Sequence, residues 1–364
     1  MRICLIGKNL SNLVLASILA NKNLNIDIVY DHSYKKGKST RTLSISNDNF
    51  NFLTKNNKKL KKISAWPIKK IKIFGQKNKS KELFEFRNKE KENFFLIKYS
   101  DLFDHNNKYL INFKNLKFLK KNRNMINKIC FKKNKYNLII NSDENSKISK
   151  QFFYRSIKKK YNSLAYTTII THEKINNYTA TQIFTKYGPL AFLPLSNFKT
   201  SIIFSYKDSS KKENQYIINI IKKYNQNYKI KKFSNIEKFE LKFKLLRKYY
   251  YKNVLSFGDL LHKIHPLAGQ GFNMTIRDIK ILSNLIDKKI SLGLELDNSM
   301  LEEFENKTKH LNYIFASGVD FIYEFFKFDN ATNNKLSDLT FRLLNKSNYL
   351  NKYSTYFADK GLKI

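Results

Sequence analysis

Residues 1–31 constrain the fold of this chain more than any other segment. A short, continuous apolar run is followed by a glycine, by apolar residues at helical spacing, and by a second apolar run that an aspartate ends. Continuous apolar runs are typical of parallel strands buried on both faces. The pattern predicts a strand, a tight turn, a helix and a second strand, at Ile3–Ile6, Gly7, 13–20 and Ile26–Tyr30, with Asp31 at the end.

This order is that of the first βαβ unit of a dinucleotide-binding domain. In such a unit the first glycine permits the turn, the helix N-terminus attracts a pyrophosphate, and a carboxylate after the second strand binds a ribose hydroxyl. Asn9 and Asn12 replace the second and third glycines of G-x-G-x-x-G. We expect the turn to persist, because asparagine tolerates left-handed conformations. A structural βαβ unit without a ligand would explain the same pattern.

The rest of the chain changes repeatedly between strand-like and helix-like spacing, and no internal repeat is evident. We predict an α/β fold in which a βαβ domain is interrupted twice by mainly β segments that form a second domain. The predicted strands cover 66–99, 136–140, 167–206 and 254–257, and the predicted helices cover 111–129, 211–223, 234–245 and the chain from 275 onward.

Length and composition narrow the class of protein. The 364 residues suffice for about two domains. No apolar run reaches the ~18 residues of a membrane-spanning helix, and no charged-then-apolar leader precedes the first predicted strand. Cys4 and Cys130 form neither a disulfide framework nor a metal-spaced cluster. We therefore expect a soluble, globular, cytoplasmic protein without a metal site.

The net charge of +40 calls for an explanation, because such a balance is typical of proteins that bind nucleic acid or anionic membranes. Only 8 of the 69 basic residues are arginine, whereas nucleic-acid surfaces favour arginine for bidentate contacts. The abundant residue types (Lys, Asn, Ile, Phe and Tyr) share AT-rich codons. We attribute most of the charge to base composition and expect no nucleic-acid partner; a lysine-rich face held against anionic lipid is the functional alternative.

The segment Gly258–Asn273 carries the strongest chemical signal, because three of the chain's ten glycines lie in it. Gly258-Asp259 follows a predicted buried strand, which places a carboxylate where α/β sheets bind ligands. Gly269-Gln270-Gly271 precedes a helical run, which aims a second helix N-terminus at an electron-rich group. A turn with an ordinary helix cap is the simpler alternative.

This segment resembles the flavin-contacting motif G-D-A-x-H-x-x-x-P-x-x-G-Q-G-x-N of class A flavoprotein aromatic hydroxylases. Its H-P-x-A-G-Q-G-x-N form is most similar to the ubiquinone-biosynthesis branch, the 2-polyprenylphenol hydroxylases. The resemblance is collinear over nearly the whole chain: Arg41–Ser46 is similar to the family's R-x-x-A-L-S segment, Gly188–Leu195 to G-P-x-A-x-L-P-L, and Phe326–Asn330 to its C-terminal segment.

The resemblance implies a Rossmann-like FAD-binding domain of the glutathione-reductase type, an inserted mainly β substrate domain and C-terminal helices. It also implies an FAD-dependent monooxygenase that hydroxylates the aromatic ring of a polyprenylated phenol in ubiquinone biosynthesis, using NAD(P)H and O₂ through a flavin hydroperoxide. The implied FAD-binding domain comprises 1–65, 102–155 and 250–315, the substrate domain 66–101 and 156–249, and the C-terminal helical segment 316–364.

The resemblance also implies roles for individual residues. The backbone N–H groups of the glycine-rich segment before residue 275 would lie near the N1–C2=O edge of the flavin. A helix N-terminus at this place stabilises the negative charge of the reduced ring. The adenosine half of FAD would be served by Gly7, Asn9, Asn12 and Asp31. Arg41 would lie near the pyrophosphate and ribityl chain, and Asp143 would serve both FAD and the nicotinamide donor. The ribityl or phosphate groups would contact Gly258 and Asp259, and the isoalloxazine would be lined by Pro266, Gly269, Gln270, Gly271 and Asn273.

Two departures from the family pattern motivate alternatives. Asn9 and Asn12 replace glycines, and Glu144 replaces the glycine of a D-G motif that serves FAD and the nicotinamide donor. A carboxylate near phosphates is unfavourable unless its side chain turns outward. A degenerate flavoprotein that acts as a structural subunit of the ubiquinone biosynthetic assembly is one alternative. A reductase of the same fold is another, and a nucleic-acid binder, motivated by charge alone, is a third.

Two further features have simple interpretations. His262 and His265 are three residues apart without a third metal ligand, so we expect packing or backbone-bonding roles; no residue is predicted to act as an acid or base. The C-terminal helices are apolar on one side (315–328, with Leu336, Leu339, Leu343 and Leu344). This side either contacts the inner membrane, where a polyprenyl substrate resides, or packs on the core.

Overall fold

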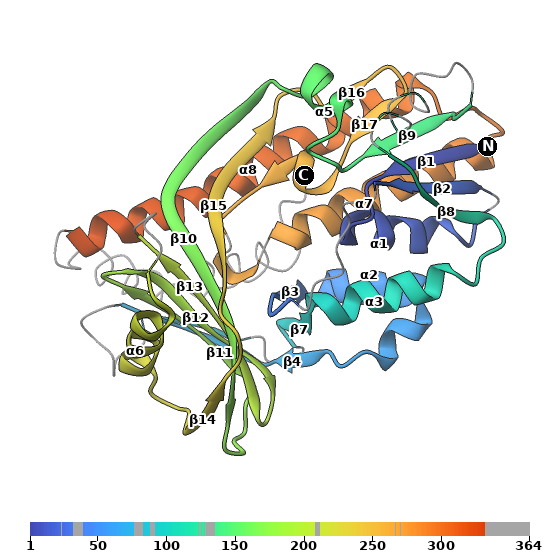
Figure 1. Cartoon of the computed structure of the whole chain (residues 1–364). Helices are drawn as coiled ribbons and strands as arrows, with labels where there is room; N and C mark the ends of the chain where they lie inside the picture. The colour runs from blue at the N-terminus through green and yellow to red at the C-terminus, as the bar shows by residue number, and fades with distance from the viewer. Residues whose placement is uncertain are drawn as a thin grey trace.

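Two large sheets and a long helix dominate the computed structural model (Figure 1). The six-stranded sheet lies at one end of the molecule and the nine-stranded sheet at the other, with a small three-stranded sheet between α2, α3 and the nine-stranded sheet. The structure describes residues 1–22, 24–31, 39–75, 83–87, 92–122, 124, 126, 128, 135–207, 212–265, 267–269 and 271–331.

The six-stranded sheet has the order β16-β17-β9-β1-β2-β8, and all its neighbouring pairs are parallel except β16 with β17. The predicted first βαβ unit is present, because α1 (Leu10–Leu19) joins β1 to its parallel neighbour β2. The strands are β1 (Arg2–Ile6), β2 (Asn25–Tyr30), β8 (Leu116–Lys120), β9 (Leu138–Asn141), β16 (Tyr250–Tyr251) and β17 (Val254–Ser256).

The core of this region is the apolar interior between the parallel strands and their helices. Every residue of β1 except Arg2 is buried, as the continuous apolar run predicts. Helix α1 packs against α3 and α7. The helices here are α2 (Asn47–Asn56), α3 (Tyr99–Leu110), α5 (Lys147–Phe152) and α7 (Gly271–Ser291), and the 3₁₀ turns are η1 (Lys58–Lys62) and η2 (Gly258–Leu260).

The nine-stranded sheet has the order β18-β15-β10-β13-β12-β11-β5-β6, with β14 paired to β10. Its longest strand, β10, runs from beside the six-stranded sheet into the middle of the large sheet (Figure 1). The strands are β5 (Lys70–Phe74), β6 (Phe84–Arg87), β10 (Ser156–His172), β11 (Thr179–Thr185), β12 (Gly188–Ser196), β13 (Lys199–Tyr206), β14 (Ile230–Phe233), β15 (Glu237–Leu246) and β18 (His262–Lys263).

Two helices pack on the large sheet. Helix α6 (Asn214–Tyr224) shares one apolar cluster with β10, β12 and β13. Helix α8 (Asn298–Ala331) shares another with β10, β11 and β15, through Phe315, Tyr323 and Phe326. The predicted helices after residue 275 are therefore present as α7 and α8.

The small sheet has the order β3-β7-β4 and links the two halves of the molecule. It joins β3 (Thr42–Ser46) to β7 (Phe94–Lys98) and β4 (Trp66–Ile68) by antiparallel pairing. Strand β3 contacts α7 and the 3₁₀ turn η3 (Leu267–Gly269), so this sheet adjoins the glycine-rich segment of the sequence.

Two predicted helices are wrong. Within 111–129, residues Leu116–Lys120 form β8, because parallel pairing with β2 outweighs the local spacing. Within 234–245, β15 pairs with β10, and its apolar side chains (Phe239, Leu241, Phe243 and Leu245) alternate with polar ones. The alternation has the period of a strand, and these side chains face the apolar cluster shared with α8.

None of the helices in the described ranges combines the length and the apolarity that crossing a membrane requires. On α8, Phe321 and Phe328 are 70% and 60% exposed, whereas Phe315 and Phe326 are buried. The apolar side predicted for the C-terminal helices is therefore partly packed and partly exposed over 315–328. Leu336, Leu339, Leu343 and Leu344 lie outside the described residues.

Two glycines with positive φ give a matched stability test. A Cβ atom at Gly188 (φ +128°) would lie 1.9 Å from the Ser205 carbonyl oxygen, whereas a Cβ atom at Gly293 (φ +66°) meets nothing within 4 Å. We expect Gly293→Ala to cost about 1 kcal/mol from backbone strain alone, and Gly188→Ala to cost at least about 2 kcal/mol more. Urea unfolding of both variants measures the difference, and equal losses would contradict the close approach of β12 and β13.

Candidate functional site

The tight turn after β1 requires its glycine. Gly7 has φ +102°, its N–H donates to the Val29 carbonyl oxygen at 2.8 Å, and a Cβ atom there would lie 3.1 Å from the Ser142 hydroxyl oxygen. The turn therefore brings the ends of β1 and β9 together beside the first residues of α1. These are the carboxyl ends of two adjacent parallel strands, where open α/β sheets bind ligands.

Asn9 and Asn12 support the turn through hydrogen bonds. The left-handed conformation expected of them is wrong: Asn9 has φ −122°, Asn12 lies within α1, and the described non-glycine residues with positive φ are Asn162 and Lys252. Asn12 Nδ2 donates to the carbonyl oxygens of Ile6 and Gly7 at 2.9 and 2.8 Å.

Asn9 occupies the position nearest the helix N-terminus. Its Oδ1 accepts from the Asn12 N–H at 3.2 Å, and its Nδ2 donates to the Ser142 hydroxyl at 2.7 Å. The side chain therefore caps α1 and uses one of the free N–H groups that a phosphate would otherwise contact.

A second group of side chains gathers at the same end of α1, around Tyr99. Burial raises the pKa of Tyr99, and the Asp259 carboxylate adds to this effect, while the Arg41 guanidinium and the Leu10 backbone N–H oppose it. The Arg41 guanidinium lies 5.5 Å from the centre of the Tyr99 ring. The structure thus brings together Arg41 and Asp259, which are far apart in the sequence, beside the first residue of α1.

Asp259 and Asp31 each follow a strand of the six-stranded sheet, at its carboxyl end. Asp259 lies in η2 just after β17, is exposed, and forms no hydrogen bond or ion pair with another described residue. Asp31 is half-exposed and directly follows β2, as predicted. A carboxylate at the end of a parallel strand can accept hydrogen bonds from hydroxyl groups of a ligand.

The glycines of the strongest motif make close backbone contacts. Gly258 (φ +60°) faces Ser11 of α1, whose Oγ would lie 2.7 Å from a Cβ atom, and Gly269 (φ +67°) faces Ser44 of β3 at 2.8 Å. Gly271 is the first residue of α7 and meets Ile264 at 3.8 Å. The motif therefore packs against both α1 and β3. Pro266 and Gln270 lie outside the described residues.

Asn273 fixes the beginning of α7 against β3. Its side chain is fully buried; Oδ1 accepts from the Ser46 N–H and from Asn49 Nδ2, both at 3.0 Å, and Nδ2 donates to the Ser44 carbonyl oxygen at 2.7 Å. Both polar atoms of the Asn273 amide are therefore bonded within the protein. Asn273 would affect a ligand indirectly, by placing the N-terminus of α7.

Asp143 and Glu144 point to different partners. Asp143 Oδ1 accepts from the Asn145 N–H at 2.9 Å, and its Cβ atom lies beside Gly7. Glu144 pairs with Lys244 of β15 at 3.1 Å and with Lys263 of β18. Burial raises the pKa of Glu144, but the two lysines lower it more, so the carboxyl is ionised. The Glu144 carboxylate is thus directed to the nine-stranded sheet. This is the orientation expected of a carboxylate that turns away from bound phosphates.

These residues suit a dinucleotide. The N-termini of α1 and α7 and the Arg41 guanidinium attract phosphate and negative charge, and the exposed Asp259 carboxylate can accept hydrogen bonds from hydroxyl groups. The positive φ angles of Gly7, Gly258 and Gly269 allow close backbone approach at three points around them. Asn9 is the feature that fits least well, because its side chain already caps α1.

The two histidines of the motif differ in their environments. His262 Nε2 is 2.7 Å from Asp278 Oδ2, and Asp278 Oδ1 accepts from Asn312 Nδ2 at 3.1 Å, so His262 belongs to a buried polar network rather than to backbone bonding. His265 is 1% exposed, and neither of its ring nitrogens has a hydrogen-bond partner. The described residues hold no cluster of three or more His, Cys, Asp or Glu side chains suited to a metal ion.

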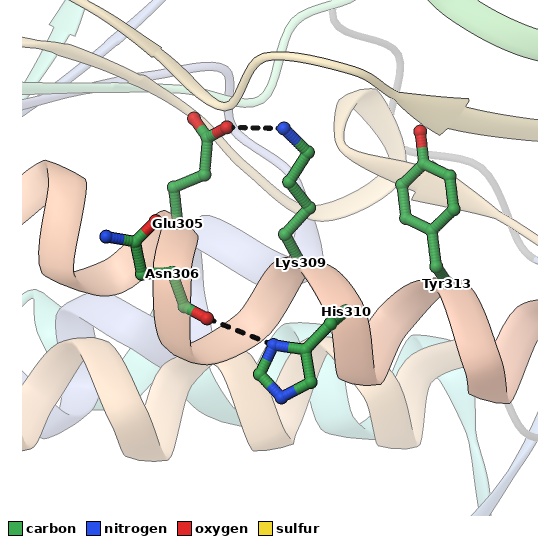
Figure 2. Close-up of a pocket in the computed structure, with 5 residues that line it drawn as sticks. All are labelled: Glu305, Asn306, Lys309, His310 and Tyr313. Carbon is green, nitrogen blue, oxygen red and sulfur yellow. Dashed lines mark hydrogen bonds and ion pairs between the residues drawn. The ribbon is translucent and has the colours of Figure 1, made fainter.

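A separate hollow of about 400 Å³ lies on α8 (Figure 2). Its polar groups are largely engaged with one another or with the loop before β16: Glu305 accepts from Lys309 at 2.7 Å and from the Tyr249 N–H at 3.0 Å, and His310 Nδ1 lies 3.0 Å from the Asn306 carbonyl oxygen. None of the predicted site residues lines it, so we do not assign the site to this hollow.

The chain resembles curated proteins of ubiquinone biosynthesis. It is 25% identical over 228 residues to the ubiquinone biosynthesis monooxygenase COQ6 of Xenopus tropicalis, covering 51% of this chain and 49% of the relative. It is 36% identical over 67 residues to the 3-demethoxyubiquinol 3-hydroxylase of Escherichia coli, covering 18% of this chain and 17% of the relative. The chain thus spans about half of these relatives' length or less. No protein-family model matches it.

The fold is that of FAD-dependent aromatic monooxygenases. The p-nitrophenol 4-monooxygenase PnpA of Pseudomonas putida superimposes with a TM-score of 0.79 at 10% identity, covering 100% of this chain and 98% of the other. HpxO of Klebsiella pneumoniae, solved with FAD and uric acid, superimposes with a TM-score of 0.71 at 10% identity, covering 99% and 97%. The predicted fold class and the resemblance to ubiquinone-biosynthesis hydroxylases are therefore confirmed.

The buried imidazole makes stability depend on pH. Burial lowers the pKa of His265 to about 3, whereas an unfolded histidine has a pKa of about 6.5. The unfolded chain thus binds a proton that the folded chain does not, so stability falls as the pH falls below about 6.5 and levels off near the folded pKa.

We expect the free energy of unfolding to fall by about 2 kcal/mol more in the parent protein than in His265→Phe between about pH 7.5 and about pH 5. Urea unfolding at both pH values measures this difference. The same pH dependence in the two proteins would show that His265 is not buried and neutral in the folded chain.

Proposed function

We propose that the protein is an FAD-dependent monooxygenase that hydroxylates the aromatic ring of a polyprenylated phenol in ubiquinone biosynthesis. Three lines support this: the likeness to COQ6 and to 3-demethoxyubiquinol 3-hydroxylase, the fold shared with FAD-dependent monooxygenases, and the residues at the N-termini of α1 and α7. The observation that carries it is that Arg41, Asp259 and the first residue of α1 come together around Tyr99.

FAD binding would use the residues already described. Gly7 gives the pyrophosphate access to α1, Asp31 accepts from the adenosine ribose, and Arg41 neutralises phosphate charge. Asp259 accepts from the ribityl hydroxyls. The turn that contains Gly269 and the start of α7 flank the flavin ring, where the helix dipole stabilises negative charge.

FAD, when bound, would supply the activated oxygen for ring hydroxylation. The protein would contribute placement and exclusion of water, because the apolar cluster between β10, β15 and α8 adjoins η3 through Leu267. In the proposed division, 1–65, 102–155 and 250–315 bind FAD, and 66–101 and 156–249 hold the phenol. The segment 316–364 is the C-terminal helical segment of this division, of which the structure describes the end of α8 up to Ala331.

The electron donor would be NAD(P)H. Glu144 does not oppose a dinucleotide donor directly, because Lys244 and Lys263 neutralise its charge and hold it toward the nine-stranded sheet. The three groups together carry a net positive charge, which suits a phosphate-bearing donor.

We propose the cytoplasmic face of the inner membrane as the place where the protein works, with other ubiquinone-biosynthesis proteins as partners. The exposed Phe321 and Phe328 of α8 support contact with the membrane surface that holds the prenylated substrate. Vesicles of anionic lipid should bind the parent protein more tightly than a Phe321→Ser, Phe328→Ser variant, and equal binding would exclude this face.

The role of Asp259 gives a direct test of FAD binding. We expect Asp259→Ala to weaken FAD about tenfold or more, because the ribityl hydroxyls lose a charged acceptor. Asp287→Ala is the matched control, because it removes an exposed carboxylate of α7 that pairs with Lys22. This variant should bind FAD like the parent. Flavin fluorescence titration measures both, and parent-like binding by Asp259→Ala would refute the assignment.

Asn9 gives a test in the opposite direction. We expect Asn9→Gly to bind FAD several-fold more tightly, because removal of the cap frees the Asn12 N–H for phosphate. The substitution costs the helix a few tenths of a kcal/mol, since glycine is itself an acceptable N-cap. Weaker or unchanged FAD binding would show that Asn9 itself contacts the cofactor or that phosphate does not reach α1.

A further inference from the structure

His265 is a buried polar side chain without a protein partner. It is 1% exposed, and both Nδ1 and Nε2 lack a hydrogen bond. A neutral imidazole carries one donor and one acceptor, and leaving both unpaired in a buried site is unfavourable. A buried side chain with both hydrogen-bonding atoms unpaired calls for a specific explanation.

The groups around His265 are satisfied, so the region is not loosely packed. The imidazole stacks on Tyr323 of α8, with ring centres 4.3 Å apart, and meets the edge of Tyr161 of β10 at 5.1 Å. The Tyr161 hydroxyl donates to Asp320 at 2.8 Å, and the Tyr323 hydroxyl lies 3.3 Å from the Ser163 hydroxyl. The histidine alone among these side chains has free hydrogen-bonding atoms.

His265 lies just after β18, next to the nine-stranded sheet that is proposed to hold the phenol. Residues 262–263 form β18 at the edge of the nine-stranded sheet, and Gly269 lies against Ser44 of β3. His265 therefore stands between the sheet proposed to hold the phenol and the turn proposed to flank the flavin. The adjoining apolar cluster includes Leu83, Phe184, Leu267, Met274, Phe315 and Phe326.

We propose that the His265 imidazole binds the ring hydroxyl of the phenolic substrate. This inference rests on the proposed function and adds a specificity residue to it. An aromatic ring suits the surrounding apolar and aromatic side chains, and a hydroxyl group matches a neutral imidazole, which can accept its proton in a hydrogen bond. The cost of the unpaired acceptor nitrogen in the free protein is then recovered when substrate binds.

The contact also favours hydroxylation. A hydrogen bond from the phenol to the imidazole polarises the O–H bond and increases electron density on the ring, which makes the ring carbons ortho and para to the hydroxyl more nucleophilic. Burial keeps the imidazole neutral and able to accept, because it lowers the pKa of His265 to about 3. The proton stays with the substrate oxygen, so no separate base is needed.

The test compares two probes that differ in one hydroxyl group. Equilibrium dialysis against the FAD-loaded protein measures the affinity for 2-propylphenol and for propylbenzene. We expect the parent to prefer the phenol, and His265→Phe to lose about tenfold of that preference by weakening the phenol alone. His265→Gln, which keeps a donor and an acceptor, should retain part of it.

Stability and FAD content separate this role from a structural one. A residue kept for binding should leave His265→Phe at least as stable as the parent in urea, with the FAD absorbance unchanged, since no protein hydrogen bond is lost. An equal preference for the phenol in parent and His265→Phe, with FAD bound in both, would overturn the inference and leave the proposed function intact. Failure of the parent to bind FAD would overturn the proposed function.

Where His265→Phe fails to fold, His265→Leu provides the same comparison with a smaller side chain. Loss of the phenol preference in a folded, FAD-loaded His265→Leu protein supports the assignment. Retention of the preference in that protein overturns it.

Discussion

The buried side chain of Asn273 holds the two segments on which the site depends. Through hydrogen bonds to Ser44, Ser46 and Asn49 it fixes the beginning of α7 against β3 and α2. Arg41 directly precedes β3, and the turn containing Gly269 directly precedes α7, so one amide group sets the distance between them. The close approach of Gly269 to Ser44 requires a residue without a Cβ atom, because a Cβ atom there would lie 2.8 Å from the Ser44 side chain.

Most charged side chains near the site are paired with opposite charges. Exposed lysines contribute the large net charge, while the groups near the site are individually matched: Glu144 with two lysines, His262 with Asp278, and Lys159 with Asp320 and Glu324. Among the described residues, the Asp259 carboxylate faces solvent, and the His265 imidazole is buried with neither ring nitrogen hydrogen-bonded. Under the proposed function, Asp259 would bind FAD and His265 would bind the phenol.

The sequence predicted the parts of the structure that depend on local order. The continuous runs of β1 and β9 and the glycines at 7, 258 and 269 are each fixed by short-range sterics, and they occur as expected. β8 and β15 were mistaken for helices because their pairing partners lie far away in the sequence. In β15 the period of two at Phe239, Leu241 and Phe243 could have revealed the strand.

The candidate site shows the same limit. The resemblance supplied Arg41 and Asp259, but their convergence on Tyr99 depends on contacts between distant segments. The use of Asn9 as a helix cap and the outward pairing of Glu144 depend on Ser142, Lys244 and Lys263, which no local pattern connects. His265 could not be distinguished from a packed core histidine, because the absence of a partner is visible only when its neighbours are placed.

The measurement that tests the account most directly is incorporation of oxygen into a phenol. The purified protein, supplied with FAD, NAD(P)H, isotopically labelled O₂ and 2-propylphenol, should yield a dihydroxybenzene that carries one labelled oxygen atom, as detected by mass spectrometry. A protein that holds FAD and oxidises NAD(P)H without labelling the phenol would contradict the assigned substrate. A protein that remains colourless and binds no FAD would contradict the account as a whole.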